Sequence, residues 1–496
     1  MSKAKCIMVQ GTMSGAGKSL LCAALCRIFA QDGYRVAPFK SQNMALNSFV
    51  TRDGLEMGRA QVVQAQAAGI EPDVRMNPIL LKPSSDVGSQ VIVNGEVRGQ
   101  MPAAAYFKMK RALIPEILSA YNSLAETVDI IVIEGAGSPA EINLKADDIV
   151  NMGLARLVDA PVLLAGDIDR GGVFAQLYGT VALLEPEERA RIKGLLINKF
   201  RGDVEILRPG LAMLEEKTQL PVLGVVPYLK VDIEDEDSLS TRLDAGRTVH
   251  PLDAAILRLP HISNFTDFMP LEQHPLLGVR YVQNTRQLGT PELIILPGTK
   301  NTVDDLLWLR QSGLEAALLK LAASGTPVLG VCGGYQMLAD PEGTESGTAQ
   351  TVRGLGLLPT HTVFTGQKHR TQDTAAVTAA LFAGAALTGY QIHTGRTEVQ
   401  GVPFCTLADG TPEGCVQDNV FGTYLHGLFD TGELTEKLVA LLCRRKGIAP
   451  DSAALIPMEQ YRQQQFDLLA DGVRGALDLD AVYAAMGLEN PRRNAQ

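Results

Sequence analysis

Short, continuous runs of apolar residues recur along this chain, and longer stretches of helical length and composition separate them. The runs of the first half are KCIMVQ, YRVAPFK, DIIVIEG, APVLLAGDID, GLLINKF and LPVLGVVPY. Unbroken apolar runs, in contrast to alternating ones, are typical of strands buried on both faces of a parallel sheet. The helical stretches between them suit right-handed crossover connections. The pattern therefore predicts an α/β fold with a doubly wound parallel sheet.

A second series of apolar runs follows a densely charged segment, VDIEDEDSLSTRLDAGR, at residues 231–247. A chain of 496 residues is long enough for two or three domains. We predict a first α/β domain over residues 1–230, a linker over 231–250, a second α/β domain over 251–447 and a helical extension over 448–496. A surface excursion within one domain is the alternative interpretation of the charged segment.

Net charge and cysteine content restrict the functional classes. The 45 lysines and arginines against 55 aspartates and glutamates give a formal charge of −10, which disfavours non-specific binding to nucleic acid or anionic membranes. No apolar stretch is long enough to span a bilayer, and the amino terminus lacks the features of a signal peptide. The seven cysteines are scattered without CxxC spacing, which favours a reducing compartment. We therefore expect a cytoplasmic protein.

A glycine-rich turn lies between the first apolar run and the first helical stretch. The order CIMVQ, GTMSGAGKS, LLCAALCRIF is strand, turn and helix, the context of a phosphate-binding loop. Backbone N–H groups at Gly15 and Gly17 can surround phosphate oxygens, Lys18 can reach the outer phosphates, and Ser19 can bind magnesium. The predicted ATP-binding residues of the loop are Thr12, Ser14, Gly15, Ala16, Gly17, Lys18 and Ser19. The strict motif has glycine where Thr12 stands, so the spacing is similar to the dethiobiotin synthetase-like branch; a turn that binds nothing is the alternative.

Polar side chains follow three further strands of the predicted sheet. Glu134 ends one apolar run, and Asp167 and Asp169 end the next. Ligands bind at the carboxyl ends of parallel strands, so we predict that Ser19, Glu134 and Asp167 bind Mg²⁺. Asn198 ends another strand and is predicted to contact adenine. The alternative for the acids is that they cap helices or face water. The alternative for Asn198 is an ordinary turn asparagine.

A polar segment, FKSQNMALNS, follows the second apolar run. It concentrates amide and basic groups that suit an anionic, polar substrate, and Arg59 and Lys82 add positive charge further along. We predict substrate-binding roles for Lys40, Gln42, Asn43, Asn47 and Arg59. An ordinary solvated loop has a similar composition and is the alternative.

A cysteine stands at the end of a strand in the second half. In PVLGVCGGYQML, Cys332 lies within G-x-C-x-G-x-Q, where glycines permit a sharp turn from strand to helix that exposes a nucleophile. A helix beginning after Cys332 would lower the pKa of its thiol. The alternative is a buried cysteine that serves only as a small apolar residue.

His426, in FGTYLHGLFD, is the predicted base for this thiol. Gly298 in LPGTKNT, with the amide after Cys332, is predicted to form an oxyanion hole. The order of Cys332 before His426 resembles that of class I glutamine amidotransferases. This resemblance implies a glutamine pocket that includes Gly334, Gln336 and His393. Gly427 and Leu428 follow His426, so the acid found two residues after the histidine in many class I amidotransferases is absent. The group that orients His426 stays open.

Eight motifs spread over essentially the whole chain resemble the cobyric acid synthase family of corrinoid biosynthesis. They are GTMSGAGKS, FKSQNMALNS, EGAGSPAEINL, GDIDRGG, LPGTKNT, GVCGGYQML, GYQIHTG and YLHGLF. The resemblance implies a P-loop synthetase domain joined to a class I glutamine amidotransferase domain. It implies amidation of the b, d, e and g carboxylates of adenosylcobyrinic acid a,c-diamide with glutamine, ATP and Mg²⁺. Cobalt would be carried by the corrinoid substrate.

Four alternatives stay open from sequence. Cobyrinic acid a,c-diamide synthase shares the chemistry but acts on other carboxylates, and FKSQNMALNS argues against it. CTP synthase has a different nucleotide loop and histidine environment. A partitioning-type ATPase usually has a lysine near the start of its loop, where this chain has Thr12 and Met13, and it leaves Cys332 unexplained. A corrinoid-binding scaffold without activity is the fourth.

Overall fold

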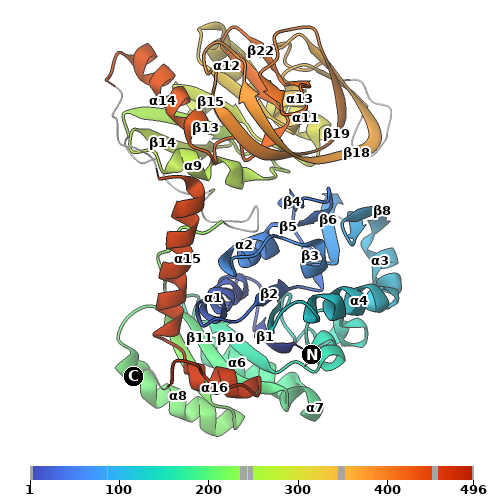
Figure 1. Ribbon diagram of the computed structural model, residues 1–496, viewed down its shortest axis with the longest axis vertical. Helices are drawn as coiled ribbons and strands as arrows, with labels where there is room; N and C mark the ends of the chain where they lie inside the picture. Colours follow the sequence, from blue (N-terminus) through green and yellow to red (C-terminus); the bar gives the residue numbers. More distant parts are fainter. Residues whose placement is uncertain are drawn as a thin grey trace. The chain divides into compact units, whose positions relative to one another are not determined.

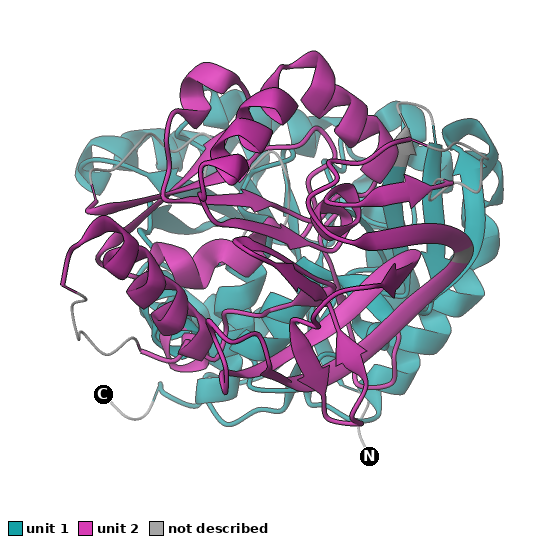
Figure 2. Cartoon of the chain, turned by 90° about the horizontal axis from the view of Figure 1, so that it is seen from above, with its two compact units in different colours: residues 1–45, 56–233, 462–496 teal, residues 46–55, 234–461 magenta. Residues whose placement is uncertain are grey.

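The computed structural model describes residues 4–85, 88–234, 243, 250–343, 352–449 and 456–493. The chain forms two compact units (Figure 2). Unit 1 comprises residues 1–45, 56–233 and 462–496, and unit 2 comprises residues 46–55 and 234–461. Most of the predicted linker over 231–250 lies outside the described residues, at 235–242 and 244–249.

Unit 1 is built on a six-stranded parallel sheet in the order β12-β11-β10-β1-β9-β2. Strands β1, β2, β10 and β11 of this sheet are labelled in Figure 1. Its strands are β1 (Lys5–Gly11), β2 (Val36–Phe39), β9 (Ile130–Glu134), β10 (Val162–Asp167), β11 (Ile192–Phe200) and β12 (Val222–Pro227). Every residue of β9 and β10 is buried, as expected for strands covered on both faces. The strand order reverses around β1, the place where open α/β sheets bind ligands.

Helices connect and cover these strands. They are α1 (Lys18–Gln31), α2 (Arg59–Ala67), α3 (Ala103–Met109), α4 (Ile114–Ala125), α5 (Met152–Val158), α6 (Val173–Leu183), α7 (Pro186–Arg189) and α8 (Val204–Thr218). Between β2 and α4 the chain forms a four-stranded sheet in the order β3-β6-β7-β8. Its strands are β3 (Gln42–Met44), β6 (Ile79–Ser85), β7 (Gly88–Val93) and β8 (Glu96–Pro102), and β5 (Glu56–Gly58) leads into α2. The short 3₁₀ turns of this unit are Val74–Met76, Lys110–Leu113 and Ile142–Asp147.

The carboxyl-terminal helices complete the core of unit 1. Helix α15 (Met458–Arg474) and helix α16 (Leu479–Ala485) bring Phe466 and Tyr483 into the same apolar cluster as α1. The ring of Tyr483 packs edge-on against Phe29, with 5.2 Å between ring centroids. Arg474 forms an ion pair with Asp32, at 3.0 Å. The carboxyl-terminal segment is therefore part of the hydrophobic core of unit 1.

Unit 2 contains a second mostly parallel sheet, in the order β14-β13-β15-β16-β23-β22, in which only the edge strand β22 runs antiparallel. Its strands are β13 (Leu252–Leu257), β14 (Leu277–Val282), β15 (Leu293–Leu296), β16 (Val328–Val331), β22 (Cys415–Gln417) and β23 (Val420–Thr423). The helices of the unit are α9 (Met269–Glu272), α10 (Thr285–Leu288), α11 (Thr302–Gln311), α12 (Leu314–Ala323), α13 (Gly333–Met337) and α14 (Glu433–Lys446), with a 3₁₀ turn at Phe265–Phe268.

A second, mainly antiparallel sheet of unit 2 is dominated by two long strands, β18 (Thr360–Val377) and β19 (Ala386–Val399). The other members are β17 (Asp340–Glu342), β20 (Cys405–Leu407), β21 (Pro412–Glu413) and β24 (Leu425–His426). The short strand β4 (Ser48–Val50) also belongs to unit 2, although it comes from the amino-terminal part of the sequence.

The prediction of α/β architecture in both halves is confirmed, with helices around mostly parallel sheets. The polar segment FKSQNMALNS divides between the units after Ala45, which sequence patterns did not predict. No helix among the described residues is both long and apolar enough to cross a membrane.

Candidate functional site

The phosphate loop joins the central strand β1 to helix α1. Gly15 and Gly17 have positive φ angles of 75° and 86°, which glycine adopts without strain. A Cβ atom at Gly17 would overlap the Asn198 amide, which donates a hydrogen bond from Nδ2 to Ala16 O at 2.9 Å. The structure thus places Asn198, predicted to contact adenine, against the backbone of the phosphate loop.

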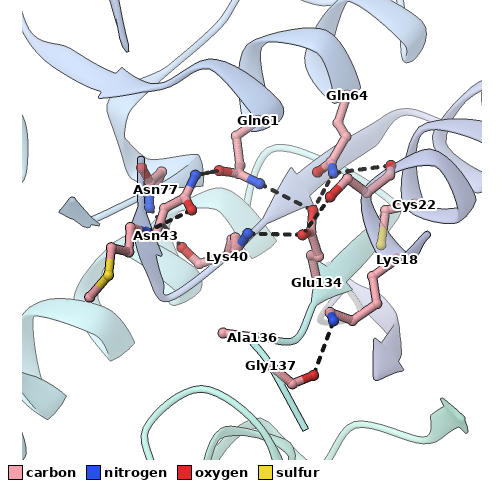
Figure 3. A network of polar contacts seen from close by, with 12 residues as sticks. Lys18, Cys22, Lys40, Asn43, Gln61, Gln64, Asn77, Glu134, Ala136 and Gly137 are labelled. Carbon is pink, nitrogen blue, oxygen red and sulfur yellow. Dashed lines mark hydrogen bonds and ion pairs between the residues drawn. The ribbon is translucent and has the colours of Figure 1, made fainter. Parts of the chain in front are cut away.

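Side chains of the loop also make contacts on both sides. Lys18 Nζ donates to Met13 O and to Gly137 O, both at 3.0 Å (Figure 3). Thr12 Oγ1 donates to Gln176 Oε1 at 3.1 Å. The loop is therefore held between the turn after β9 and helix α6, and Ser14 and Gly15 are exposed at its tip.

Glu134 is the centre of a buried polar network (Figure 3). Register in the parallel sheet pairs Glu134 with Val9 of β1, which brings the carboxylate beside the phosphate loop. Glu134 Oε1 accepts hydrogen bonds from Ser19 Oγ and Lys40 Nζ, both at 2.9 Å. Oε2 accepts from Gln64 Nε2 at 2.5 Å and from Gln61 Nε2 at 3.4 Å.

The charge of Glu134 is stabilised although the side chain is only 2 % exposed. Burial alone would raise the pKa of this carboxyl group. The ammonium group of Lys40 and the donors of Gln64 and Ser19 outweigh burial, so the pKa lies below its ordinary value. The site therefore holds a carboxylate at neutral pH next to the Ser19 hydroxyl.

Asp167, the second predicted magnesium ligand, ends the strand on the other side of β1. Its Oδ2 forms an ion pair with Lys199 Nζ at 2.8 Å, and its Oδ1 accepts from Asp169 N at 2.9 Å. Lys199 Nζ also donates to Gly15 O at 2.6 Å. Lys199 thereby connects the Asp167 carboxylate to the tip of the phosphate loop.

The predicted substrate-binding residues do not form one cluster. Lys40 is committed to Glu134, and Asn43 Nδ2 donates to Gln61 Oε1 at 3.1 Å, so both belong to the network around the phosphate loop. Gln42 Oε1 accepts from Tyr106 OH at 2.6 Å. Arg59 is buried at the first turn of α2. Asn47 lies in unit 2.

Cys332 occupies the sharp turn between β16 and α13. Its φ is +51° and its ψ is −109°, a strained backbone for a residue other than glycine. The turn packs closely against β15. A Cβ at Gly334 would overlap the Leu296 carbonyl oxygen, so only glycine fits there. Cys332 N donates to Thr423 O at 2.8 Å, which ties the turn to the neighbouring strand β23. The geometry matches the predicted nucleophile elbow.

His426 lies at the end of β24, after β23, and the Cys332 thiol is one of the groups that raise the pKa of its imidazole. Cys332 Sγ itself donates to Ile392 O at 3.6 Å. On its other side, His426 Nδ1 lies 2.6 Å from Asp267 Oδ2. Asp267 Oδ1 accepts from Gly427 N at 3.1 Å. With Nδ1 engaged by Asp267, Nε2 is the ring nitrogen that remains to exchange a proton with the thiol. Cysteine, histidine and aspartate therefore form an array that suits nucleophilic catalysis.

The electrostatic setting of His426 favours the protonated ring. Burial lowers the pKa of the imidazole, but the Asp267 carboxylate and the Cys332 thiol overcome that effect and raise it to about 10. The Tyr390 ring stacks on the imidazole with 5.2 Å between centroids and 23° between planes. The imidazole is thus held by charge at its edge and by an aromatic ring at its face.

The remaining predicted residues of this site lie close to the array. A Cβ at Gly298 would be 3.3 Å from His426 Cε1, so the turn after β15 abuts the histidine. Gln336 is buried, with its Oε1 accepting from Thr302 at 2.9 Å and its Nε2 donating to Tyr424 at 3.2 Å. His393 stacks on Tyr424, and its Nε2 is buried without a hydrogen-bond partner in the described part of the chain. Burial lowers the pKa of His393 to about 3, so its ring is neutral.

Sequence reasoning missed two charged groups of these sites. Asp267 follows β13 only after an intervening loop and lies in the 3₁₀ turn Phe265–Phe268, so the rule that selected Glu134 and Asp167, acids directly after strands of a parallel sheet, does not select it. Lys199 follows Asn198 directly at the end of β11 and has a positive φ of 62°, but no motif in the sequence identifies it. Lys199 reaches Asp167 because β11 lies beside β10 in the sheet, and this strand order is a property of the folded chain.

Known protein families match both halves of the chain. Residues 7–239 match the model of the CobQ/CobB/MinD/ParA nucleotide binding domain, and residues 253–434 match the CobB/CobQ-like glutamine amidotransferase domain. A protein named cobyric acid synthase from Lachnoclostridium phytofermentans is 56% identical, over 97% of this chain and 99% of its own length. Proteins of the same name from Ruminiclostridium cellulolyticum (54%, covering 98% and 98%) and Citrobacter koseri (52%, covering 97% and 98%) are similar over the same extent.

Proposed function

This chain belongs to the cobyric acid synthase family, as its motifs predicted, and we propose that it amidates adenosylcobyrinic acid a,c-diamide at the b, d, e and g carboxylates. Glutamine supplies the nitrogen, ATP supplies the activation, and the product is adenosylcobyric acid. One observation carries most weight: a cysteine–histidine–aspartate array and a phosphate loop occur in a single chain. The scattered cysteines favour a cytoplasmic location.

Glutamine hydrolysis begins at Cys332. The thiolate attacks the side-chain carboxamide carbon, and the oxyanion is stabilised by backbone N–H groups at Gly298 and after Cys332. His426 gives its proton to the leaving nitrogen, the carbon–nitrogen bond breaks, and ammonia and a glutamyl thioester result. Water, deprotonated by His426, then hydrolyses the thioester to glutamate. His393 Nε2 is buried near this array and has no hydrogen-bond partner among the described residues, which supports its predicted role in the glutamine pocket.

The phosphate loop supports the ATP-dependent half-reaction. A free carboxylate is a poor electrophile, so the substrate carboxylate attacks the γ-phosphorus of ATP, ADP leaves, and ammonia displaces phosphate from the acyl phosphate. Lys18 and the glycine-rich backbone suit the phosphates of ATP. Gln42, Asn43 and Arg59 are the proposed contacts for the corrinoid side chains.

The oxygen groups around the loop fit magnesium. Ser19, Glu134 and Asp167 offer a hydroxyl and two carboxylates, which are the hard ligands that Mg²⁺ prefers. The described residues contain no group of three or more His, Cys, Asp or Glu side chains placed to hold a metal alone. This donor set suits an ion that arrives with nucleotide phosphates and retains water. When bound, Mg²⁺ would neutralise charge on the transferring phosphoryl group.

Mass spectrometry of the corrinoid product tests the proposal. The purified protein is incubated with adenosylcobyrinic acid a,c-diamide, ATP, Mg²⁺ and glutamine, and a fourfold amidated product is expected. Omission of ATP or of glutamine should each prevent the reaction. No change with this substrate, together with double amidation of unamidated cobyrinic acid, would reassign the chain to a,c-diamide synthesis.

A further inference from the structure

A short piece of the amino-terminal sequence lies within the amidotransferase unit. Residues 46–55 belong to unit 2, whereas residues 45 and 56 on either side belong to unit 1 (Figure 2). Glu56, directly after the segment, is buried and ion-paired with Lys82 at 3.0 Å within unit 1. The chain that directly follows the segment is therefore fixed within unit 1.

Two asparagines connect this segment to the loop that carries Asp267. Asn264 N donates to Asn47 Oδ1 at 2.7 Å, and Ser48 N donates to Asn264 Oδ1 at 3.1 Å. Asn47, Ser48 and Asn264 are each at most 4 % exposed. Buried hydrogen bonds of this reciprocal kind fix the backbone of both partners.

The orientation of the Asn264 amide follows from this contact. Because Oδ1 accepts from Ser48 N, Nδ2 must be the end that faces His426, and it lies 3.5 Å from both ring nitrogens. Asn264 also begins the 3₁₀ turn of Asp267, whose N donates to Asn264 O at 3.1 Å. The residue that contacts the segment therefore also fixes the turn that presents the Asp267 carboxylate.

A second connection reaches the face of the imidazole. Tyr390, which stacks on His426, donates its hydroxyl hydrogen to Ser48 O at 3.1 Å. Phe49 packs edge-on against the Tyr390 ring, with 5.1 Å between centroids. Gln372 Nε2 donates to Val50 O at 2.8 Å and holds the end of β4. Both the edge and the face of the catalytic ring are thus supported by groups that contact residues 47–50.

We propose that residues 46–55 are a positioning element of the glutaminase site, acting on His426 through Asn264 and Tyr390. The inference rests on the proposed roles of Cys332 and His426. It means that glutamine hydrolysis in unit 2 depends on a segment continuous at both ends with the nucleotide-binding unit. Asn47 acts within the amidotransferase site rather than on the corrinoid.

Asn47→Ala tests this inference because it removes the oxygen that accepts from Asn264 N. We expect kcat for glutamate release, measured without corrinoid, to fall about tenfold with KM for glutamine changed less than about twofold, the pattern of a hydrogen bond needed in the transition state. Asp53→Asn is the matched control, because Asp53 lies in the same segment and is exposed. Its kinetics should equal those of the wild type.

The pH dependence of Cys332 alkylation by iodoacetamide, followed by peptide mass spectrometry, is the second readout. It reports on the thiol, His426 and the groups that face that ring: Asp267, Asn264, Tyr390 and His393. A displaced ring changes this profile, whereas a general loss of folded protein lowers its amplitude only. Asn47→Ala should shift the midpoint by at least about half a pH unit, and Asp53→Asn should leave it in place.

Tyr390→Phe keeps the inference testable if Asn47→Ala does not fold. It removes the hydroxyl bonded to Ser48 O and retains the ring that stacks on His426, so a smaller shift of the same profile is expected. An unchanged profile and unchanged kcat in the folded variants would overturn the inference while leaving the proposed function intact. Absence of glutamate release in the wild type, with the Asn47→Ala profile shifted, would instead contradict the proposed function alone.

Discussion

Glu134 in unit 1 and Asp267 in unit 2 are both buried acids, but their partners differ. Glu134 accepts from four side chains, including the ammonium group of Lys40. Asp267 contacts the titratable imidazole of His426 and accepts a hydrogen bond from one backbone N–H, that of Gly427. Side-chain donors can rotate away from a carboxylate, whereas a backbone donor cannot. The two proposed roles need this difference: magnesium at Glu134 would have to replace its side-chain partners, and proton transfer by His426 would need Asp267 to stay in place.

Replacement of the nucleophile gives the largest expected effect. Cys332→Ala should lower glutamine-driven amidation by at least about 10⁴-fold, because no other group in the array can form the thioester. Amidation with ammonium salts should continue, since the phosphate loop lies in the other unit. The corrinoid product with each nitrogen source is measured by mass spectrometry. Loss of both activities would show that the two units do not work as separable sites.

Asp267→Asn tests the acid of unit 2. The pKa of His426 is raised to about 10 from an ordinary value of 6.5, chiefly by Asp267 once burial is overcome. We expect glutamate release to fall on the order of 10³-fold, as when other triads lose the acid that orients histidine. Proton-linked stabilisation from this pair is fully present below about pH 6.5 and is lost as pH rises to about 10.

The stability of Asp267→Asn relative to the wild type should depend on pH, because the stabilisation that the variant lacks is lost as pH rises. In urea unfolding, the free energy of unfolding of the wild type should exceed that of Asp267→Asn by the largest amount near pH 6. This difference should shrink towards pH 10. A difference that grew with pH would contradict the assignment of a protonated His426. Ammonia-driven amidation serves as the control and should be unaffected.

Glu134→Gln tests the acid of unit 1. It removes the charge that pairs with Lys40 and the predicted magnesium ligand, so we expect corrinoid amidation to fall about 100-fold with either nitrogen source. Glutamate release measured without corrinoid should stay within about twofold. The double variant Lys40→Met/Glu134→Gln removes the unpaired buried cation and separates lost chemistry from lost stability. Restored activity in the double variant would show that the carboxylate has no direct role.

Lys199→Met should produce a smaller change. Lys199 joins Asp167 to Gly15 at the tip of the phosphate loop, so its loss should raise KM for ATP about five- to tenfold. Lys193→Met is the control, because Lys193 lies exposed on the same strand. Initial rates of ADP formation at varied ATP provide the comparison. Equal KM values for the two variants would remove Lys199 from the nucleotide site.

The smallest expected effect concerns the carboxyl-terminal helices. Arg474→Ala removes one ion pair to Asp32, while Arg492 still contacts the same carboxylate. We expect a loss of about 1 kcal/mol in the free energy of unfolding and no change in glutamate release. Urea unfolding followed by circular dichroism measures it. A change in glutaminase kinetics would show that these helices influence unit 2.

Local patterns predicted the strands, the phosphate loop and the cysteine elbow because each depends on adjacent residues. Cys332, for example, is defined by glycines two residues away on either side. Asp267 was missed because it follows β13 only after an intervening loop that includes Asn264 in a left-handed conformation. The position of Asn47 was beyond sequence reasoning for another reason. An amide-rich segment has the same composition whether it contacts substrate or a distant loop, and Asn264 lies more than 200 residues away.

Unit 1 is assembled from three pieces of chain, and the last of them contributes α16 and most of α15 to its core. During synthesis the chain emerges from its amino terminus, so every residue of unit 2 is available before the final piece of unit 1 has been made. The nucleotide-binding unit, whose phosphate loop is translated before most of unit 2, therefore completes its hydrophobic core after unit 2 has been made. We expect nascent chains that stop before residue 462 to contain a finished amidotransferase fold beside an open nucleotide-binding sheet.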